Sequence, residues 1–265
     1  MKKSLFVKRN CERGGIGLVV YDYELNLSLQ EYFYFQECPQ KFRLYRILNP
    51  LPMKNSFQTT KRTISEYILR GYNETELEGI KLHQFFATFH QLYAYCISKG
   101  IIPPEIKAKK ELLNFWNYQQ QRYITCRGTY YWKPLYTELA LMTKKQRGIV
   151  DCLEIINENG DLRLIDYKKS QNSMDFEALQ FYALLVEEFM IENNWEDLTL
   201  KEVGCYYYSI GKLEVQPYPS GLKKVVENKI QQILQKIEAE NFFLKKESCA
   251  QCQLRMICHI DQGEK

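Results

Sequence analysis

Two neighbouring stretches near the middle of the chain have the pattern of strands and predict a β-hairpin. Residues 148–156 are rich in β-branched and apolar side chains, and 162–168 have the pattern of the return strand. Between them, residues 157–161 read Asn-Glu-Asn-Gly-Asp, and the Asn-Gly pair is the strongest short-range signal for a hairpin turn. Side chains alternate between the faces of a strand, so each strand has an apolar face that ends in charge. We expect these charges at a sheet end on the core side.

The charged residues of this hairpin are Asp151, Asp166 and Lys168. Two carboxylates can hold a hard divalent cation such as Mg²⁺. A lysine beside them can orient or deprotonate a water, or stabilise the charge of a phosphorane. The hairpin therefore has the groups for metal-assisted phosphodiester hydrolysis. A surface hairpin with an ordinary Asp/Lys pair is the alternative, because a short D-x-K sequence is a weak signal by itself.

Helical periodicity dominates the chain on either side of the hairpin. We expect residues 1–36 to be irregular or β. The expected helices are 40–47, 62–72, 75–99, 103–122, 175–193 and 221–240, and the further strands are 137–142, 202–209 and 213–216. Asp175 is the expected cap of the fifth helix, and the last helix is amphipathic with a lysine-rich polar face. This order predicts an α/β fold with a core at about 135–240.

The composition is that of a folded protein that could bind nucleic acid. The chain has 265 residues, 45% of them hydrophobic, which supports a real core, and a net charge of +4, which permits nucleic-acid binding. Without a secretory signal or a run of about 18 apolar residues, we expect a cytoplasmic protein that does not enter a membrane. The aromatic clusters 130–132 and 206–208 are either core residues or stacking platforms for single strands.

Nine cysteines are present, and three of them form the pattern C-x2-C-x5-C near the end of the chain, at Cys249, Cys252 and Cys258. Three soft thiolates suit Zn²⁺ or an iron–sulfur cluster, and either needs a fourth ligand. Cys258 and His259 are adjacent, which makes joint ligation of one ion awkward, whereas Cys38 precedes a proline, as is common in cluster loops. The candidates for the fourth ligand are His259, Cys38, Cys11 and Cys126. The remaining cysteines, Cys96, Cys152 and Cys205, fit core positions.

These motifs together resemble the RecB-like branch of the PD-(D/E)XK nuclease superfamily over about residues 30–260. The iron–sulfur members of that branch include the CRISPR-associated RecB-like exonucleases and the nuclease domain of the AddAB-type helicase–nuclease B subunit. Residues 37–45 resemble the family's cluster cysteine and the basic-aromatic helix after it. Residues 79–83 resemble its G-x-x-x-H element, 148–151 its G-x-x-D motif and 166–168 its D/E-x-K motif. The cysteine triplet resembles the family's C-terminal one.

The resemblance implies a restriction-endonuclease-like core, with a mixed central sheet flanked by helices. It implies that His83, Asp151 and Asp166 bind Mg²⁺ or Mn²⁺ together with the backbone carbonyl of Tyr167. Lys168 would position or activate water and stabilise the phosphorane.

For the cysteines, the resemblance implies a 4Fe–4S cluster held by Cys38, Cys249, Cys252 and Cys258. Such a cluster would tie the two chain ends together, so its role would be structural. The implied organisation is an N-terminal segment and helical region at 1–134, a nuclease core at 135–245 and a cysteine segment at 246–265.

The helix after the D-x-K motif departs from the family pattern, which has Q-x-x-x-Y. Tyr182 fits the tyrosine, but Ala178 stands where the glutamine is expected. Gln180 is nearby, yet residues two apart on a helix point about 200° apart, so it cannot replace the missing amide. Glu138 matches a frequent family glutamate, with a solvated strand-end charge as the alternative. We expect His90 to be structural.

The expected function is metal-dependent DNA hydrolysis, as an exonuclease on single-stranded DNA or overhangs, in CRISPR adaptation or DNA repair. The length without a helicase motif favours the CRISPR-associated group. Basic residues of the N-terminal helices and of 221–240 would follow the phosphates. The expected partners are DNA with CRISPR integration proteins or a helicase. Two alternatives stay open: a catalytically silent DNA-binding or assembly module of the same fold, and the same nuclease with zinc in place of the cluster.

Overall fold

The structure of the protein, a computed structural model, describes residues 6–12, 15–21, 26–48, 73–171, 175–255 and 258. The chain folds into two units built from separated segments. The first unit comprises 1–58, 142–147 and 227–265, and the second comprises 59–141 and 148–226. The helix expected at 62–72 and the side chain of His259 lie outside the described residues. The division at residues 134 and 245 stays a prediction.

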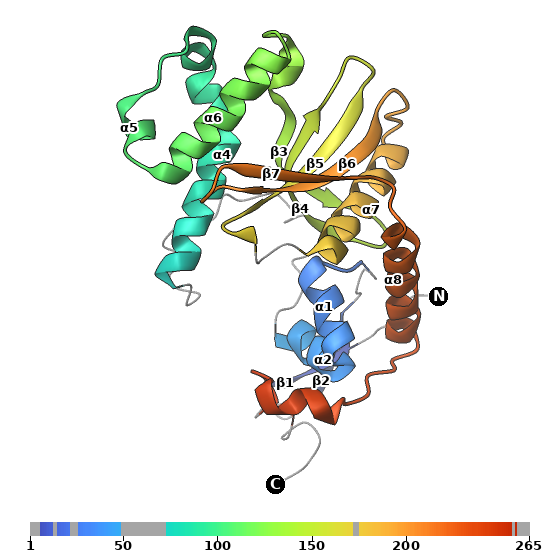
Figure 1. Ribbon diagram of the computed structural model, residues 1–265. Coiled ribbons are helices and arrows are strands. Elements are labelled where there is room, and N and C mark those ends of the chain that lie inside the picture. Colours follow the sequence, from blue (N-terminus) through green and yellow to red (C-terminus); the bar gives the residue numbers. More distant parts are fainter. Residues whose placement is uncertain are drawn as a thin grey trace. The chain divides into compact units, whose positions relative to one another are not determined.

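A five-stranded mixed sheet forms the centre of the second unit (Figure 1). Its strands, in spatial order, are β3 (Pro134–Met142), β4 (Arg147–Ile155), β5 (Asp161–Lys168), β6 (Thr199–Tyr207) and β7 (Lys212–Pro217). β4 and β5 are antiparallel, β5 and β6 are parallel, and β6 and β7 are antiparallel. The parallel pair requires a crossover, which α7 (Phe176–Glu192) supplies. The expected α/β fold with a mixed sheet is confirmed.

Helices cover both faces of this sheet. On one face, Leu179 and Ala183 of α7 join Leu164 of β5 in an aliphatic core. On the other face, α4 (Glu74–Lys99) and α6 (Lys110–Thr125) bury an aromatic core against the sheet, and Figure 1 shows these helices opposite α7. Sheets whose two faces both lie against helices are apolar on both sides, which explains why the last five residues of β6, from Val203 to Tyr207, are all buried.

The ends of α4 follow from its sequence. Asn73 and Glu76 form a capping box at the N-terminus, and Gly100 ends the helix in the left-handed conformation at φ 66°. The helix expected from Pro103 to 122, however, is wrong as a single element. The turn α5 (Pro104–Lys107) ends before Lys109, whose extended backbone (φ −127°) interrupts the helical hydrogen bonds before α6 begins.

The first unit contains α1 (Leu29–Glu37), α2 (Pro39–Leu48) and a β1–β2 hairpin (Phe6–Glu12 and Gly15–Tyr21). The expectation that residues 1–36 are irregular or β is correct for the β1–β2 hairpin and wrong for α1. α1 begins here because Ser28 and Glu31 form a capping box. The Ser28 hydroxyl accepts a hydrogen bond from the N–H of Glu31, and the Glu31 carboxylate accepts one from the N–H of Ser28.

Buried charges hold this unit together. Glu31, which is 1% exposed, accepts hydrogen bonds from Nε of Arg46 at 2.9 Å and from the Arg147 guanidinium at 2.5 Å. Both arginines also donate to the backbone carbonyl of Asn26. Burial alone would raise the pKa of Glu31, but the two guanidinium charges outweigh it and lower that pKa.

The amphipathic helix expected at 221–240 is present as α8 (Leu222–Glu238), and a 3₁₀ helix, η4 (Lys246–Gln251), follows it. Among the helices in the described part of the chain, none is long and apolar enough to cross a membrane.

Candidate active site

The predicted hairpin is confirmed as β4 and β5. The antiparallel register pairs Cys152 with Ile165 and Leu153 with Leu164. Continued by one residue, it sets Asp151 opposite Asp166, at the point where β4 and β5 both carry their charges. Directly opposed residues share a face, so the two carboxylates are neighbours because of the register alone.

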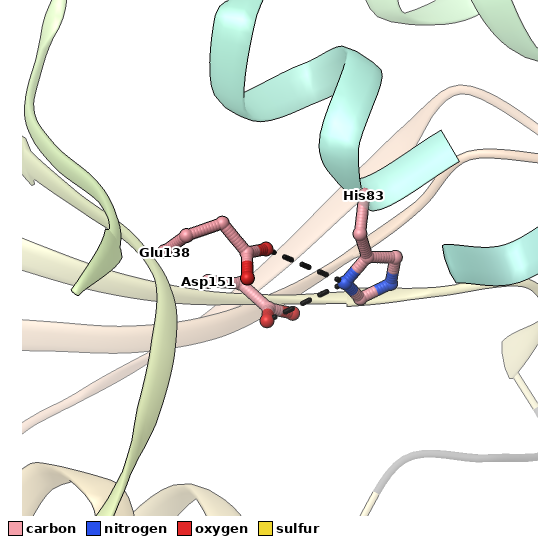
Figure 2. Close-up of side chains that lie close together, drawn as sticks. All are labelled: His83, Glu138 and Asp151. Carbon is pink, nitrogen blue, oxygen red and sulfur yellow. Dashed lines mark ion pairs between the residues drawn. The ribbon is translucent and has the colours of Figure 1, made fainter. Parts of the chain in front are cut away.

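His83 reaches this point from α4. Leu82, Phe86 and Phe89 lie on the buried side of the helix, and Phe86 stacks on Phe115 with ring centroids 4.1 Å apart. This packing fixes the rotation of α4 about its axis and directs His83 at the sheet. Its Nδ1 lies 3.4 Å from Asp151 Oδ1 and 3.9 Å from Glu138 Oε1. Figure 2 shows the imidazole facing both carboxylates.

Glu138 is the third member of this group and sits in unusual backbone. Its φ is 50°, which is uncommon for a residue with a Cβ and which occurs at sites that the surrounding structure over-determines. Oε1 of Glu138 is buried and makes no hydrogen bond within the described structure. Ligand atoms of His83, Glu138 and Asp151 all lie within 4.8 Å of one another. The chain therefore directs an unsatisfied carboxylate oxygen at the other two side chains.

The D-x-K motif completes the cluster. Nζ of Lys168 lies 2.7 Å from Oδ2 of Asp166. Between them in sequence, Tyr167 donates its backbone N–H to Oδ2 of Asp151 at 2.8 Å, which fixes the orientation of that carboxylate. The Tyr167 ring points to the opposite side of the strand and packs edge-on against His83, with centroids 5.7 Å apart. The role of the Tyr167 carbonyl as a ligand stays a prediction.

The pKa values of the charged groups in this cluster are shifted in different directions. Burial would lower the pKa of His83, but the charges of Asp151 and Glu138 outweigh it and raise this pKa to about 9. For Asp151, burial opposes ionisation, yet the His83 charge and the hydrogen bonds to the carboxylate lower its pKa. His83 and Asp151 are thus an ion pair at neutral pH.

Glu138 and Asp166 are shifted in the opposite direction. Burial and, after it, the negative charge of Asp151 raise the pKa of each to about 7. Burial opposes the charge of Lys168, but Asp166 outweighs it and raises the Lys168 pKa. A cluster of three carboxylates with one imidazolium and one ammonium carries repulsion between its acids, which a cation between them would relieve.

These donors fit a hard divalent metal ion. Two carboxylate oxygens and one imidazole nitrogen suit Mn²⁺, and carboxylates with retained waters suit Mg²⁺. The fit rests on the unsatisfied Oε1 of Glu138 and on the spacing of the ligand atoms.

A comparison with family models decides what kind of site this is. Residues 26–259 match the model of the PD-(D/E)XK nuclease superfamily. The chain belongs to that superfamily. No curated protein matches the chain.

PD-(D/E)XK nucleases are metal-dependent and use ions such as Mg²⁺ or Mn²⁺, and both the sheet and the acidic cluster of this chain accord with that chemistry. The superfamily match covers the expected G-x-x-D and D-x-K motifs. It does not identify the RecB-like iron–sulfur branch, which stays part of the proposal below.

The helix that follows the D-x-K sequence, α7, carries a tyrosine ring close to the acidic cluster. Tyr182 packs on Gly148, because a Cβ at position 148 would lie 2.9 Å from Cε1 of Tyr182. Burial and the charges of Asp166 and Asp151 raise the pKa of Tyr182, which is consistent with a ring beside the acids. Gln180 is fully buried, and neither atom of its amide makes a hydrogen bond in the described structure. That Gln180 does not replace the glutamine missing at Ala178 stays a prediction.

The four cysteines of the resemblance meet within the first unit of this PD-(D/E)XK protein. Cys38, Cys249, Cys252 and Cys258 line one cavity. Lys245 donates to the carbonyl of Gln36, and Ser248 to that of Glu37, so the cysteine segment is held against the residues before Cys38.

The structure also places other residues that the sequence suggested as ligands or stacking residues. Cys126 is buried in the aromatic core of the second unit. His90 is structural, since its Nε2 hydrogen-bonds with Oε1 of Gln119 at 2.8 Å and burial lowers its pKa to about 4. Trp132 and Tyr206–Tyr208 are buried core residues, so these aromatics are not stacking platforms. Sequence reasoning gave Glu138 only a supporting role, and the positive φ that aims it leaves no signal in the sequence.

Proposed function

We propose that this protein is a metal-dependent deoxyribonuclease, an exonuclease on single-stranded DNA or overhangs that acts in CRISPR adaptation or DNA repair. The observation that carries the proposal is the convergence of His83, Glu138 and Asp151 beside the Asp166–Lys168 pair. Superfamily membership supports phosphodiester hydrolysis, and the excess of basic side chains supports a polyanionic substrate.

In this proposal His83, Glu138, Asp151 and Asp166 hold Mg²⁺ or Mn²⁺, with the Tyr167 carbonyl as a further ligand. The ion, when bound, would polarise the phosphate and supply a water nucleophile at neutral pH. Asp151 is kept ionised and oriented by His83 and by the Tyr167 N–H.

Lys168 has a separate role. Its ammonium is held by Asp166 and its pKa is raised, so it carries a positive charge at neutral pH. That state suits stabilisation of the charge that develops on the phosphoryl oxygens better than it suits removal of a proton from water.

Tyr182 lies against Gly148 and beside the acids, where its ring can contact the nucleotide at the scissile bond. With Ala178 in place of the family's glutamine, the substrate contacts of this helix depend on Tyr182.

We also propose a structural 4Fe–4S cluster on Cys38, Cys249, Cys252 and Cys258. Three basic side chains, Lys41, Lys245 and Arg255, line the same cavity and would balance the negative charge of a cluster with four thiolates.

The nuclease is tested with purified protein, a labelled single-stranded oligonucleotide and Mn²⁺. We expect cleavage by the wild type, a loss of at least about a hundredfold in Lys168→Ala from the missing electrostatic stabilisation, and no loss in Lys144→Ala, an exposed lysine outside the site. Binding without cleavage by the wild type would favour the silent DNA-binding module. Equal cleavage by wild type and Lys168→Ala would contradict the catalytic assignment.

The cluster is tested by metal analysis and absorbance of protein purified without air. We expect iron, acid-labile sulfide and a brown colour, all lost in Cys38→Ser and kept in Cys96→Ser. Stoichiometric zinc without iron would support the zinc alternative instead.

A further inference from the structure

A second hollow in the first unit has Lys245 in common with the cysteine cavity but otherwise a different lining. It holds about 230 Å³, against the roughly 30 Å³ that a water occupies in the liquid, and so has room for a phosphate with its neighbouring groups. The residues that line it are Phe35, Gln36, Pro39, Lys229, Gln232, Ile233, Lys236, Phe243 and Lys245.

The charge of this hollow is of one sign. Three of its lining residues are lysines, and among the described residues that line it none carries a carboxylate. Lys229 and Lys236 are seven positions apart on α8, with Gln232 and Ile233 between them, so they project from one face of the helix. Lys245 is held at the wall by the hydrogen bond from its Nζ to the Gln36 carbonyl, 2.6 Å long. Ammonium groups concentrated around a hollow attract an anion with several oxygen atoms.

The hollow also offers an aromatic surface at its rim. Phe243 is 45% exposed, which is uncommon for a phenylalanine beside a charged pocket, and Nζ of Lys236 lies 5.9 Å from the centre of its ring. Ile233, which is 5% exposed, belongs to the apolar part of the lining. A cationic wall beside an exposed aromatic face is the arrangement that binds single-stranded nucleic acid, with phosphates on the lysines and a base on the ring.

We propose that this hollow is a subsite for a single nucleic-acid strand, in which Lys229, Lys236 and Lys245 bind phosphate and Phe243 stacks on a base. The inference rests on the proposed function for the presence of a nucleic acid, and it adds a binding site in the unit that does not contain the catalytic cluster. Because stacking needs an unpaired base, the subsite selects single strands over duplex.

The test measures binding alone, in EDTA, so that it does not depend on hydrolysis. A fluorescein-labelled oligo-dT and an abasic oligonucleotide with the same number of phosphates are titrated with the full chain, and anisotropy is read at several salt concentrations. We expect Lys236→Gln to weaken both ligands and to reduce the salt slope by about 0.7, the value for one phosphate contact on a single strand. Phe243→Leu should weaken oligo-dT by at least about fivefold and leave the abasic ligand unchanged.

The matched control is Lys144→Gln, an exposed lysine of the same unit that does not line the hollow, for which we expect wild-type binding. Unchanged binding in both Lys236→Gln and Phe243→Leu would overturn the subsite. Equal effects of Phe243→Leu on both ligands would overturn the stacking role. Because these titrations contain no metal ion, failure of the nuclease assignment shows separately, as absence of Lys168-dependent cleavage.

Discussion

The ring of Tyr182 occupies the space that a side chain at position 148 would need, with only 2.9 Å between its Cε1 and a Cβ built on Gly148. The glycine of the G-x-x-D motif is therefore explained by packing, since the strand that carries Asp151 must pass directly under a tyrosine that lies beside the acidic cluster. Two motifs separated by more than thirty positions are fitted to each other.

Gly148→Ala tests this packing. We expect the free energy of unfolding to fall by about 1–3 kcal/mol through overpacking, and cleavage to fall as Tyr182 is displaced. The measurement is a double-mutant cycle with Tyr182→Ala by chemical denaturation. In the Tyr182→Ala background the added methyl group should change the free energy of unfolding little, because the ring that it would contact is absent. Additive effects of the two changes would contradict the fitted pair.

Glu138→Gln should stabilise the metal-free protein at alkaline pH and weaken its metal binding. The pKa of Glu138 is raised to about 7, mainly by burial, so the cost of its ionised form appears as pH rises from 4.5 through 7. We expect the Tm in EDTA to rise by a few degrees at pH 8.5 and to stay unchanged at pH 5, where Glu138 is protonated. An equal increase in Tm at pH 5 and at pH 8.5 would show that the ionisation of Glu138 is not the cause.

Metal affinity should increase with pH. In the metal-free protein His83 titrates near pH 9, and Glu138 and Asp166 near pH 7, so each holds a proton at pH 6 that a metal ion must displace. Titration calorimetry with Mn²⁺ should show a Kd that falls from pH 6 to 8, by up to about tenfold per pH unit for each proton released. Glu138→Gln should release fewer protons than the wild type. An affinity independent of pH would exclude these side chains as the ligands.

Glu31→Gln should destabilise the first unit by about 3–5 kcal/mol, because it leaves two buried guanidinium groups without a counter-charge. The three tryptophans, Trp116, Trp132 and Trp195, all belong to the second unit, so the probe is the rate of amide hydrogen exchange in α1 and α2 of the first unit.

The control for Glu31→Gln is Glu37→Gln. Glu37 pairs with Lys41 at a more exposed position, so this change should lower the free energy of unfolding by at most about 1 kcal/mol. The pKa of Glu31 is lowered, so its contribution is present above pH 4.5 and is lost as pH falls through the lowered value. Equal exchange rates in the Glu31 and Glu37 variants would contradict the role of the buried pair.

Sequence reasoning reached the parts of the fold that local chemistry determines. The β4–β5 hairpin follows from an Asn-Gly turn between two alternating runs, and α4 ends where Gly100 permits a left-handed residue. The capping box at Ser28 was an equally local signal, but the aromatic run after it has the composition of a strand, and α1 was missed for that reason.

The candidate site was predictable only in part. The opposition of Asp151 and Asp166 is a matter of hairpin register, which sequence alone provides. His83 joins them through the aromatic packing of α4 on the sheet, and only a family resemblance could indicate that. The prominence of Glu138 depends on a backbone conformation that tertiary contacts impose, so no sequence pattern could have given it more than a supporting role.

The hydrogen bonds from Lys245 and Ser248 to the carbonyls of Gln36 and Glu37 join residues more than two hundred positions apart. Contacts of this sequence separation form late, because a long stretch of chain must first be closed into a loop. During synthesis, therefore, α1 and Cys38 emerge long before their partners exist. The cysteine cavity can close only after residue 258 has left the ribosome, so any group that the four cysteines hold together must be delivered after that point.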